Sequence, residues 1–89
     1  MQDDAKAVLN WRNHGVSFEM ALDVFKDIFV IEWTDDRPSD TEERFVTVGM
    51  VEGRLLFVAY TPRCERIRII SARAAEQRER RRYHNENET

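Results

Sequence analysis

The residues best suited to chemistry in this 89-residue chain are the arginines near its C-terminal end. Residues 63–82 contain eight Arg and three Glu, a net charge of +5, whereas the whole chain carries −3. Arg presents a planar fork of donors that suits bidentate contact with phosphate. A basic segment on an acidic body therefore predicts binding to a polyanion or an acidic partner, although a solvated helix with Glu–Arg pairs explains the same composition.

The run from Arg66 to Arg73, Arg-Ile-Arg-Ile-Ile-Ser-Ala-Arg, is the most specific candidate for a phosphate site. Its alternation predicts a strand over 66–71, with Arg66 and Arg68 on one face and the intervening isoleucines toward the core. Two guanidinium groups on one face suit a phosphate clamp, and a solvent-facing strand is the alternative. We expect Arg73 just past the strand, near the start of a helix whose N-terminus also favours an anion.

His14 is the one internal histidine, and an ordinary imidazole pKa of about 6.5 suits proton transfer near neutrality. Its position beside Gly15 also suits a structural role, because a cation complements the last carbonyls of a helix. The sequence has no Cys and His cluster with zinc spacing and no acidic constellation of metal-binding spacing. We therefore expect neither a metal nor a cofactor. Cys64 has no neighbouring base in the sequence and is not expected to be a nucleophile.

The elements that must position these residues follow from periodicity, caps and turn formers. Gly15 is expected to end the first helix, Ser17 to cap the second, and Glu52-Gly53 to form a hairpin turn. The predicted elements are helices from 3–13, from Ser17 onward and over 74–84, strands over 28–33, 44–51, 54–61 and 66–71, a loop over 34–43 and a frayed tail over 85–89. Short turns require antiparallel neighbours, so this order predicts one α+β domain over 1–89.

Length and composition exclude several other classes of protein. The chain has no run of about 18 apolar residues, so no membrane span is expected. Its polar, acidic N-terminus does not resemble a secretory signal. A single cysteine forms no internal disulfide, which fits a reducing cytoplasm. With 42% apolar residues, a chain this short forms one modest core and places any chemical site on its surface.

Two segments together resemble the BrnT family of type II toxins. The first is His14-Gly-Val-Ser-Phe-Glu19 with Ala21 and Val24-Phe-Lys-Asp27, and the second is Arg66 to Arg73 followed by Ala75, Glu79-Arg80 and Tyr83. The resemblance implies a RelE-like ribonuclease fold, an antiparallel sheet of three to four strands with two N-terminal helices and one C-terminal helix. It also implies a BrnA-like antitoxin and a toxin homodimer within a toxin–antitoxin heterotetramer.

Two positions depart from the family's usual pattern. BrnT-like chains begin with a short strand that ends near a Trp-Asp pair, whereas Gln2-Asp3 stands there in this chain. We expect a missing edge strand to weaken the sheet or expose its edge. A Lys usually precedes the His-Gly pair, whereas this chain has Asn13. If that Lys binds phosphate in the family, activity here is expected to be reduced.

The resemblance and the residues together predict a cytoplasmic, metal-independent endoribonuclease that cleaves mRNA and arrests translation. The expected catalytic residues are Arg68, Arg73 and His14. The expected RNA-binding residues are Arg66, Arg80, Arg81 and Tyr83. Two alternatives stay open: a ParE-like toxin that binds DNA gyrase without cleaving nucleic acid, and a catalytically inactive module that only assembles with its partner.

Overall fold

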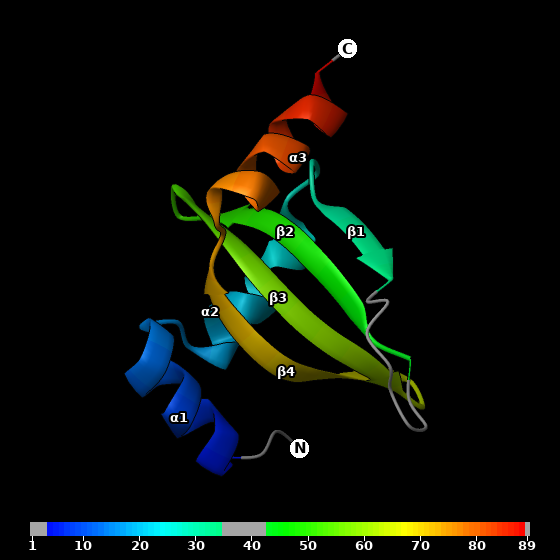
Figure 1. The fold of residues 1–89 in the computed structure, drawn as a ribbon. Helices are drawn as coiled ribbons and strands as arrows, with labels where there is room; N and C mark the ends of the chain where they lie inside the picture. The colour runs from blue at the N-terminus through cyan, green and yellow to red at the C-terminus, as the bar shows by residue number, and fades with distance from the viewer. Residues whose placement is uncertain (1–3, 35–42, 89) are drawn as a thin grey trace.

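The computed structural model describes residues 4–34 and 43–88, which form an α+β fold (Figure 1). The predicted loop over 34–43 falls mostly outside these residues, as do Gln2 and Asp3. The described elements are α1 (Asp4–His14), α2 (Phe18–Leu22), the 3-10 turn η1 (Asp23–Lys26), β1 (Ile31–Thr34), β2 (Phe45–Val51), β3 (Arg54–Arg63), β4 (Arg66–Ala74) and α3 (Gln77–Asn87).

The four described strands form an antiparallel sheet in the order β1-β2-β3-β4. This arrangement confirms the predicted α+β meander. The predicted hairpin at Glu52-Gly53 is also confirmed, with positive φ angles of 50° and 80°, as tight hairpin turns require. In the view of Figure 1, α2 lies behind the sheet and α3 lies across its upper end. The two faces of the sheet therefore meet different elements.

The apolar core lies between one face of the sheet and the N-terminal helices. Its fully or almost fully buried residues come from α2 and its surroundings on one side and from the three longer strands on the other. They include Val16, Phe18, Ala21, Val24, Val51, Leu56, Val58, Ile69 and Ala72. Burial of these side chains supplies most of the hydrophobic stabilisation expected for so small a domain.

Gly49 on β2 allows η1 to approach the sheet closely. A Cβ atom at this position would lie 2.9 Å from the carbonyl oxygen of Val24 and 3.0 Å from its Cβ. Such a contact forces the backbone of η1 away from the sheet. The glycine therefore sets the distance between the two layers at this point.

The turn between α1 and α2 follows the sequence prediction. Gly15 ends α1 with a φ of 66°, and its N–H donates to the Trp11 carbonyl at 2.8 Å. Ser17 caps α2 through its hydroxyl, which accepts from the Met20 N–H at 3.1 Å. Both signals are local, which is why the sequence shows them directly.

Asn10 ties α1 to β4, an outer strand of the described sheet. Its amide nitrogen donates to the Ala72 carbonyl at 2.8 Å, and its amide oxygen accepts from the Ala72 N–H at 3.0 Å. The same amide nitrogen donates to the Val16 carbonyl at 2.8 Å. A side chain thus satisfies the outward-facing backbone groups of the strand, as a neighbouring strand would. The backbone groups of β4 are therefore paired at Ala72, although no further strand lies beside β4 among the described residues.

The first strand is shorter than predicted. Instead of 28–33 it spans Ile31–Thr34, because the preceding residues form a turn around Asp27. The Val30 N–H donates to the Asp27 carbonyl at 3.1 Å, and the Phe29 N–H donates to its carboxylate at 2.9 Å. The apolar residues in this turn indicated a strand, but local hydrogen bonding to Asp27 prevailed.

The last two strands and the C-terminal helix end at later residues than predicted. β3 continues to Arg63, and β4 continues to Ala74, so Arg73 lies within the strand and not beyond it. The last helix begins at Gln77 and continues through Asn87, so residues 85–87 are helical where a frayed tail was expected. The Asn87 amide donates to the Phe29 carbonyl at 2.9 Å, which holds this end of the helix in place.

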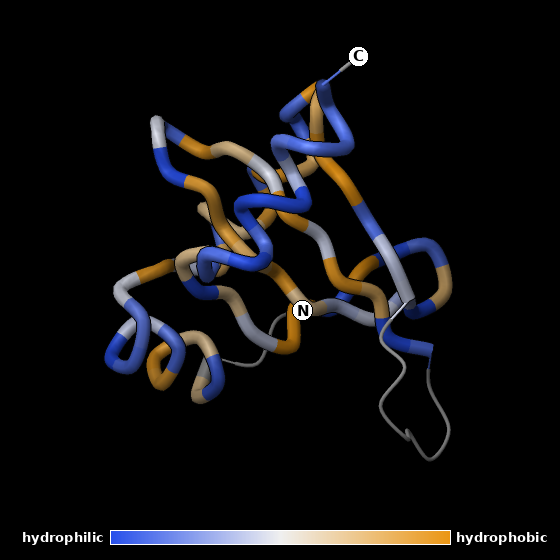
Figure 2. The backbone as a smooth tube through the Cα atoms, turned by 45° about the horizontal axis from the view of Figure 1, so that its top comes forward, coloured by the Kyte–Doolittle hydropathy of each residue, from blue (hydrophilic) through white to orange (hydrophobic). Residues whose placement is uncertain are grey.

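The last helix is strongly polar, and most of its backbone is coloured hydrophilic in Figure 2. It is attached to the sheet by Tyr83, whose ring packs with Ile31, Val48 and Ala75. The Tyr83 hydroxyl donates to the Asp27 carboxylate at 2.6 Å. None of the helices among residues 4–34 and 43–88 is long and apolar enough to cross a membrane.

Candidate nucleic-acid site

A β-bulge in β4 decides which arginines share a face of the sheet. Tyr60 pairs with Ile69, but the adjacent Ala59 pairs with Ser71, so Ile70 is an extra residue in the strand. Residues directly opposite one another lie on the same face. Arg68 opposes Thr61 and Arg73 opposes Phe57, and these two β3 residues share a face.

Arg68 and Arg73 therefore project from the same side, which is the side opposite the main core. In an uninterrupted strand, a separation of five residues would place them on opposite faces. The bulge thus brings together the two arginines that the sequence predicted to act together. It also places Ser71 on their face, opposite Ala59.

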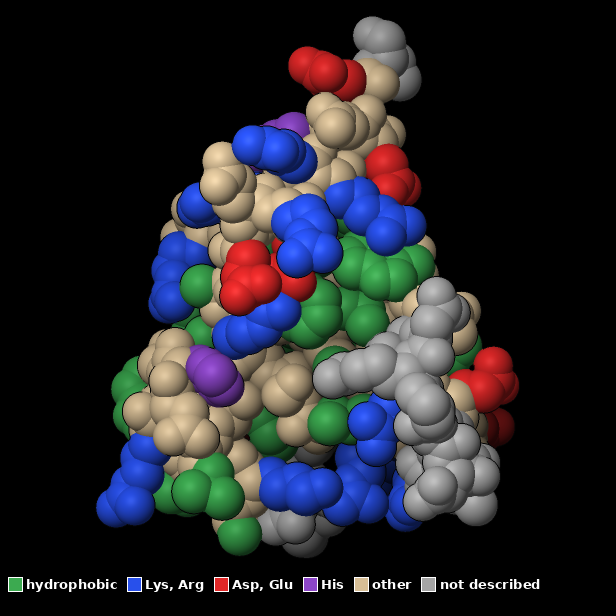
Figure 3. All heavy atoms as spheres, in the orientation of Figure 1, with side chains coloured by type: hydrophobic (Ala, Val, Ile, Leu, Met, Phe, Trp, Pro, Cys, Tyr) green, Lys and Arg blue, Asp and Glu red, His purple; other side chains and the backbone are tan. Residues whose placement is uncertain are grey.

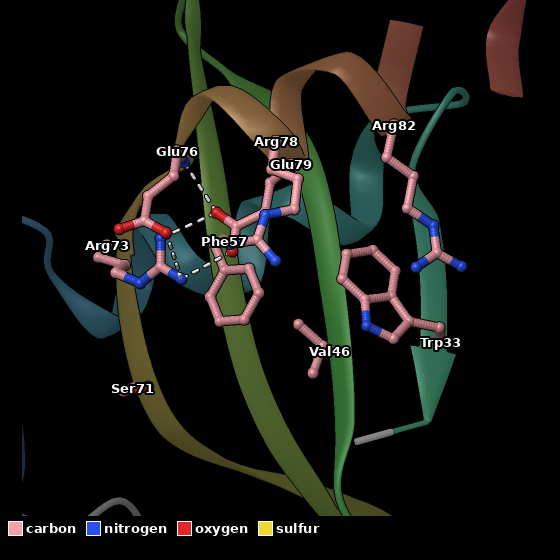
Figure 4. Close-up of a pocket in the computed structure, with 9 residues that line it drawn as sticks. All are labelled: Trp33, Val46, Phe57, Ser71, Arg73, Glu76, Arg78, Glu79 and Arg82. Carbon is pink, nitrogen blue, oxygen red and sulfur yellow. Dashed lines mark hydrogen bonds and ion pairs between the residues drawn. The ribbon is translucent and has the colours of Figure 1, made fainter. Parts of the chain in front are cut away.

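A pocket of about 600 Å³ lies on this face, between the sheet and the first turns of α3 (Figure 4). Its floor comes from the strands, and its charged rim comes mainly from α3. The lining residues are Trp33, Val46, Phe57, Ser71, Arg73, Glu76, Arg78, Glu79 and Arg82. The volume is within the range of roughly 300–1,000 Å³ that is common for small-molecule sites.

Arg73 connects β4 to α3 through Glu79. Its Nη1 and Nη2 donate to the two carboxylate oxygens of Glu79 at 2.9 and 2.7 Å. Nη1 also donates to the Ala74 carbonyl at 3.1 Å. The guanidinium carbon lies 4.0 Å from the centroid of the Phe57 ring. Arg73 is therefore rigidly placed, with its side chain 28% exposed.

This arrangement leaves part of the Arg73 guanidinium available. Of the five N–H donors of an arginine, three are used by Glu79 and Ala74. The Nε–H and one Nη2–H have no hydrogen-bond partner among the described residues. The hydrogen bonds to Glu79 also raise the pKa of Arg73 above its ordinary value, so the group keeps its charge.

Arg78 and Arg82 lie one helical turn apart and face the pocket from α3 (Figure 4). The guanidinium carbon of Arg82 lies 4.1 Å from the centroid of the Trp33 ring, and its Nε donates to Glu86 at 2.7 Å. Within the described part of the chain, Arg78 forms no hydrogen bond or ion pair. The sequence analysis did not name these two arginines among the expected site residues, whereas the structure places them at the same pocket as Arg73.

Glu76 and Glu79 also line the pocket, and the sequence analysis missed both as site residues. They form the capping box of α3, in which the Glu76 N–H donates to the Glu79 carboxylate at 2.8 Å. The spacing of two glutamates three residues apart was a visible signal for this cap. The Glu79 side chain is only 14% exposed, whereas that of Glu76 is 73% exposed and lies 4.0 Å from Arg73.

The other predicted site residues are distributed over several surfaces. Arg66 lies two residues before Arg68 on β4, farther from the pocket. His14 is exposed at the end of α1 and does not line the pocket, and neighbouring Asn13 is also exposed. The roles predicted for His14, Arg66 and Arg68 remain predictions.

The helical residues predicted to bind RNA face different directions. Arg80 lines a separate hollow of about 320 Å³, together with Arg54 of the β2–β3 hairpin. Arg81 is exposed outside both hollows, so its role also remains a prediction. Tyr83 is only 6% exposed and its hydroxyl donates to Asp27, so the RNA-binding role expected for it remains a prediction. Packing of α3 against the sheet is the role that its contacts define.

The surface of this face is rich in cations. Figure 3 shows Lys and Arg side chains gathered over α3 and again near the lower end of the sheet, with apolar side chains between them. Among residues 4–34 and 43–88, no group of three or more His, Cys, Asp or Glu side chains is placed to hold a metal ion. The chemical groups of the pocket are thus guanidinium, carboxylate, hydroxyl and aromatic ring.

Fold and pocket define a small α+β domain with a basic, aromatic-lined site on the less covered face of an antiparallel sheet. Such a site has donors for phosphate and flat surfaces for a base. The chain belongs to the family described as "Ribonuclease toxin, BrnT, of type II toxin-antitoxin system", whose profile matches residues 3–79. No individual curated protein matches the chain by sequence. Membership in this family identifies a ribonuclease toxin with an antitoxin partner.

Proposed function

We propose that this protein is a metal-independent endoribonuclease that cleaves mRNA in the cytoplasm and thereby arrests translation. The observation that supports this most directly is the pocket in which Arg73, Arg78 and Arg82 face two aromatic rings. Three guanidinium groups provide the positive donors that a cleaved phosphate requires as negative charge develops. The family description supports ribonuclease activity over the gyrase-binding alternative.

In this proposal, Arg73 contacts the scissile phosphate and Arg68 contacts a flanking one. Arg73 lines the pocket and retains two free donors, whereas Arg68 lies farther along β4. Their β3 partners Phe57 and Thr61 are four residues apart, which corresponds to about 13 Å along a strand. This distance favours contact with two separate phosphates over a clamp on a single one.

Glu76 is the proposed proton acceptor. Among the lining residues, the carboxylates of Glu76 and Glu79 are the groups suited to this task, and Glu79 is already bonded to Arg73 and to the Glu76 amide. The 2′-hydroxyl gives its proton to Glu76 as its oxygen attacks phosphorus, and the bond from phosphorus to the 5′ oxygen breaks. The 5′ oxygen takes a proton from water, and the products are a 2′,3′-cyclic phosphate and a 5′-hydroxyl.

Replacement of Arg73 tests the proposal, with Glu79 as the matched control. Arg73→Ala is expected to reduce RNA cleavage on the order of 100- to 1,000-fold, because one donor to the transition state is lost. Glu79→Gln weakens the same ion pair but leaves the guanidinium in the pocket, so cleavage per folded molecule is expected to fall far less. Circular dichroism gives the folded fraction, and gel analysis of labelled RNA gives the rate.

Equal losses in the two variants, after correction for the folded fraction, would show that Arg73 acts only by holding α3. Wild-type cleavage is expected to continue in EDTA and to leave a cyclic or 3′-phosphate end. Abolition by EDTA contradicts the metal-independent mechanism. The same assay separates the proton acceptors, since Glu76→Gln is expected to lose activity and His14→Ala to retain it. If His14→Ala lost activity and Glu76→Gln retained it, the catalytic site would have to lie at α1.

The antitoxin is proposed to be BrnA-like and to cover the arginine-rich face with an acidic or amphipathic segment. The charge of residues 63–82 and the exposed Arg78, Arg80 and Arg81 support this placement. The complex is proposed to be a heterotetramer built around a toxin dimer. Electrostatic steering then makes the association rate fall as salt increases. Stopped-flow measurements showing the same rate at low and high salt would argue against this surface.

A further inference from the structure

We propose that the pocket on the α3 side of the sheet binds one nucleotide of single-stranded RNA, with the base against Trp33 and the phosphate at Arg78. This inference names a substrate subsite within the proposed ribonuclease function and rests on that function. It concerns recognition of the RNA, and its outcome is measured without cleavage.

The aromatic part of the subsite comes from β1 and β3, the two strands that flank β2 in the sheet. Trp33 of β1 and Phe57 of β3 both line the pocket, and their ring centroids are 6.3 Å apart with an interplanar angle of 61°. Both rings are only half-buried. Partly exposed aromatic rings on a sheet face are the usual surface on which unpaired RNA bases stack, because every base has a flat π-face.

Each ring carries a guanidinium group. Arg82 lies over Trp33 at 4.1 Å, and Arg73 lies over Phe57 at 4.0 Å. Guanidinium planes are themselves stacking surfaces for bases, and cation–π contact adds to the attraction. Arg82 is fixed at its Nε by Glu86, while its side chain is 47% exposed. The pocket therefore offers alternating ring and guanidinium surfaces at one end.

The phosphate part of the subsite is Arg78. It lines the same pocket one helical turn before Arg82, and it has no ion-pair partner within the described residues. Arg73, in contrast, is held by Glu79, and Arg82 by Glu86. Arg78 is thus the guanidinium of the pocket whose full fork is free for a phosphate. Ser71 adds a hydroxyl on the floor.

A purely structural reading assigns the Arg82–Trp33 contact to the attachment of α3. That attachment already has other components, namely Tyr83 with Asp27, Asn87 with Phe29, and Arg73 with Glu79. Trp33 moreover faces a pocket of about 600 Å³ and is not enclosed by the helix. Both observations favour a ligand-binding role for this ring.

Tryptophan fluorescence tests the inference, because the chain has two tryptophans, Trp33 in the pocket and Trp11 on α1. Trp11→Phe leaves Trp33 as the only emitter, and Trp33→Phe leaves Trp11. Titration with adenosine 3′-monophosphate is expected to quench the Trp11→Phe variant and to leave the emission of the Trp33→Phe variant unchanged. Equal quenching of both variants, or of neither, would overturn the proposal.

Further probes separate the two parts of the ligand. Adenosine is expected to quench Trp33 more weakly, and inorganic phosphate alone is expected not to quench it. Arg78→Ala is expected to lower affinity for the nucleotide about 10-fold without changing affinity for adenosine, whereas Arg12→Ala, at the exposed end of α1, changes neither. Trp33→Ala is expected to lower nucleotide affinity about 10-fold or more, measured by calorimetry.

The quenching experiment and the cleavage assay can fail separately, so failure of the subsite is distinguishable from failure of the catalytic proposal. Cleavage of RNA without nucleotide quenching of Trp33 means that the subsite is wrong and the ribonuclease function stands. Quenching by the nucleotide without any cleavage of RNA means that the subsite stands and the catalytic proposal fails. If inorganic phosphate alone quenches Trp33 as strongly as the nucleotide does, the assignment of the base to Trp33 is overturned.

Discussion

The two faces of the sheet are covered in different ways. On one face, Val16, Phe18, Ala21 and Val24 close over the strands and leave an apolar layer that is 4% exposed or less. On the other, a strongly polar helix crosses one end and is attached by the small apolar cluster around Tyr83, by side-chain hydrogen bonds and by an ion pair. The first arrangement stabilises the fold through apolar burial, and the second leaves charged and aromatic groups accessible.

This difference shows how a chain of 89 residues has both a core and a site. A sheet with two apolar layers would bury more surface, but it would leave no concave, charged surface for a ligand. Polar attachments such as Arg73–Glu79 hold α3 while keeping charges at the pocket. The expectation is that substitutions on the core face mainly change stability, whereas those on the α3 face mainly change binding and activity.

The largest effect on stability is expected for Leu56→Ala, which empties a fully buried position on the core face. Deletion of a buried leucine side chain typically costs about 2–5 kcal/mol of unfolding free energy. Leu55→Ala, at the adjacent and half-buried position on the α3 face, is expected to cost less than half as much. Urea unfolding measures both, and equal losses would contradict the proposed difference between the faces.

A smaller loss of unfolding free energy is expected for Tyr83→Phe on the α3 face. Loss of the hydroxyl removes its hydrogen bond to Asp27, which should cost about 1.5 kcal/mol near neutral pH. Burial would by itself raise the pKa of Asp27, but hydrogen bonds from Tyr83, Met50 and Phe29 outweigh it, and the pKa is lowered. Burial and the bond to Asp27 raise the pKa of Tyr83 to about 12.

These two shifts define the pH window in which the bond stabilises the fold. Because the pKa of Asp27 is lowered in the folded protein, its carboxylate stabilises the fold at pH values above the pKa of the unfolded chain, about 3.9. This contribution is lost as the pH falls through the pKa of the folded state. Because the pKa of Tyr83 is raised, its protonated hydroxyl stabilises the fold fully at pH values below the unfolded pKa of about 10. This contribution is lost as the pH rises through the folded pKa of about 12. The difference between wild type and Tyr83→Phe should therefore be largest from about pH 5 to 9, and a constant difference down to acid pH would contradict this.

The sequence determined the features that depend on local chemistry. The caps at Gly15 and Ser17, the hairpin at Glu52-Gly53 and the alternation of residues in β4 are short-range signals, and the structure confirms them. The ordered pair of motifs also identified the family, which the match over residues 3–79 confirms. These signals persist because turn and cap geometry depends on a few neighbouring residues.

Only the tertiary structure decided which residues meet at the pocket. The bulge at Ile70 shifts the alternation of β4, so that Arg73 joins the face of Arg68. Trp33 is 40 residues before Arg73 in the sequence, yet both line the same pocket with Arg78 and Arg82. Strand register, a bulge and the rotation of α3 about its axis depend on long-range packing, and no local pattern in the chain reveals them.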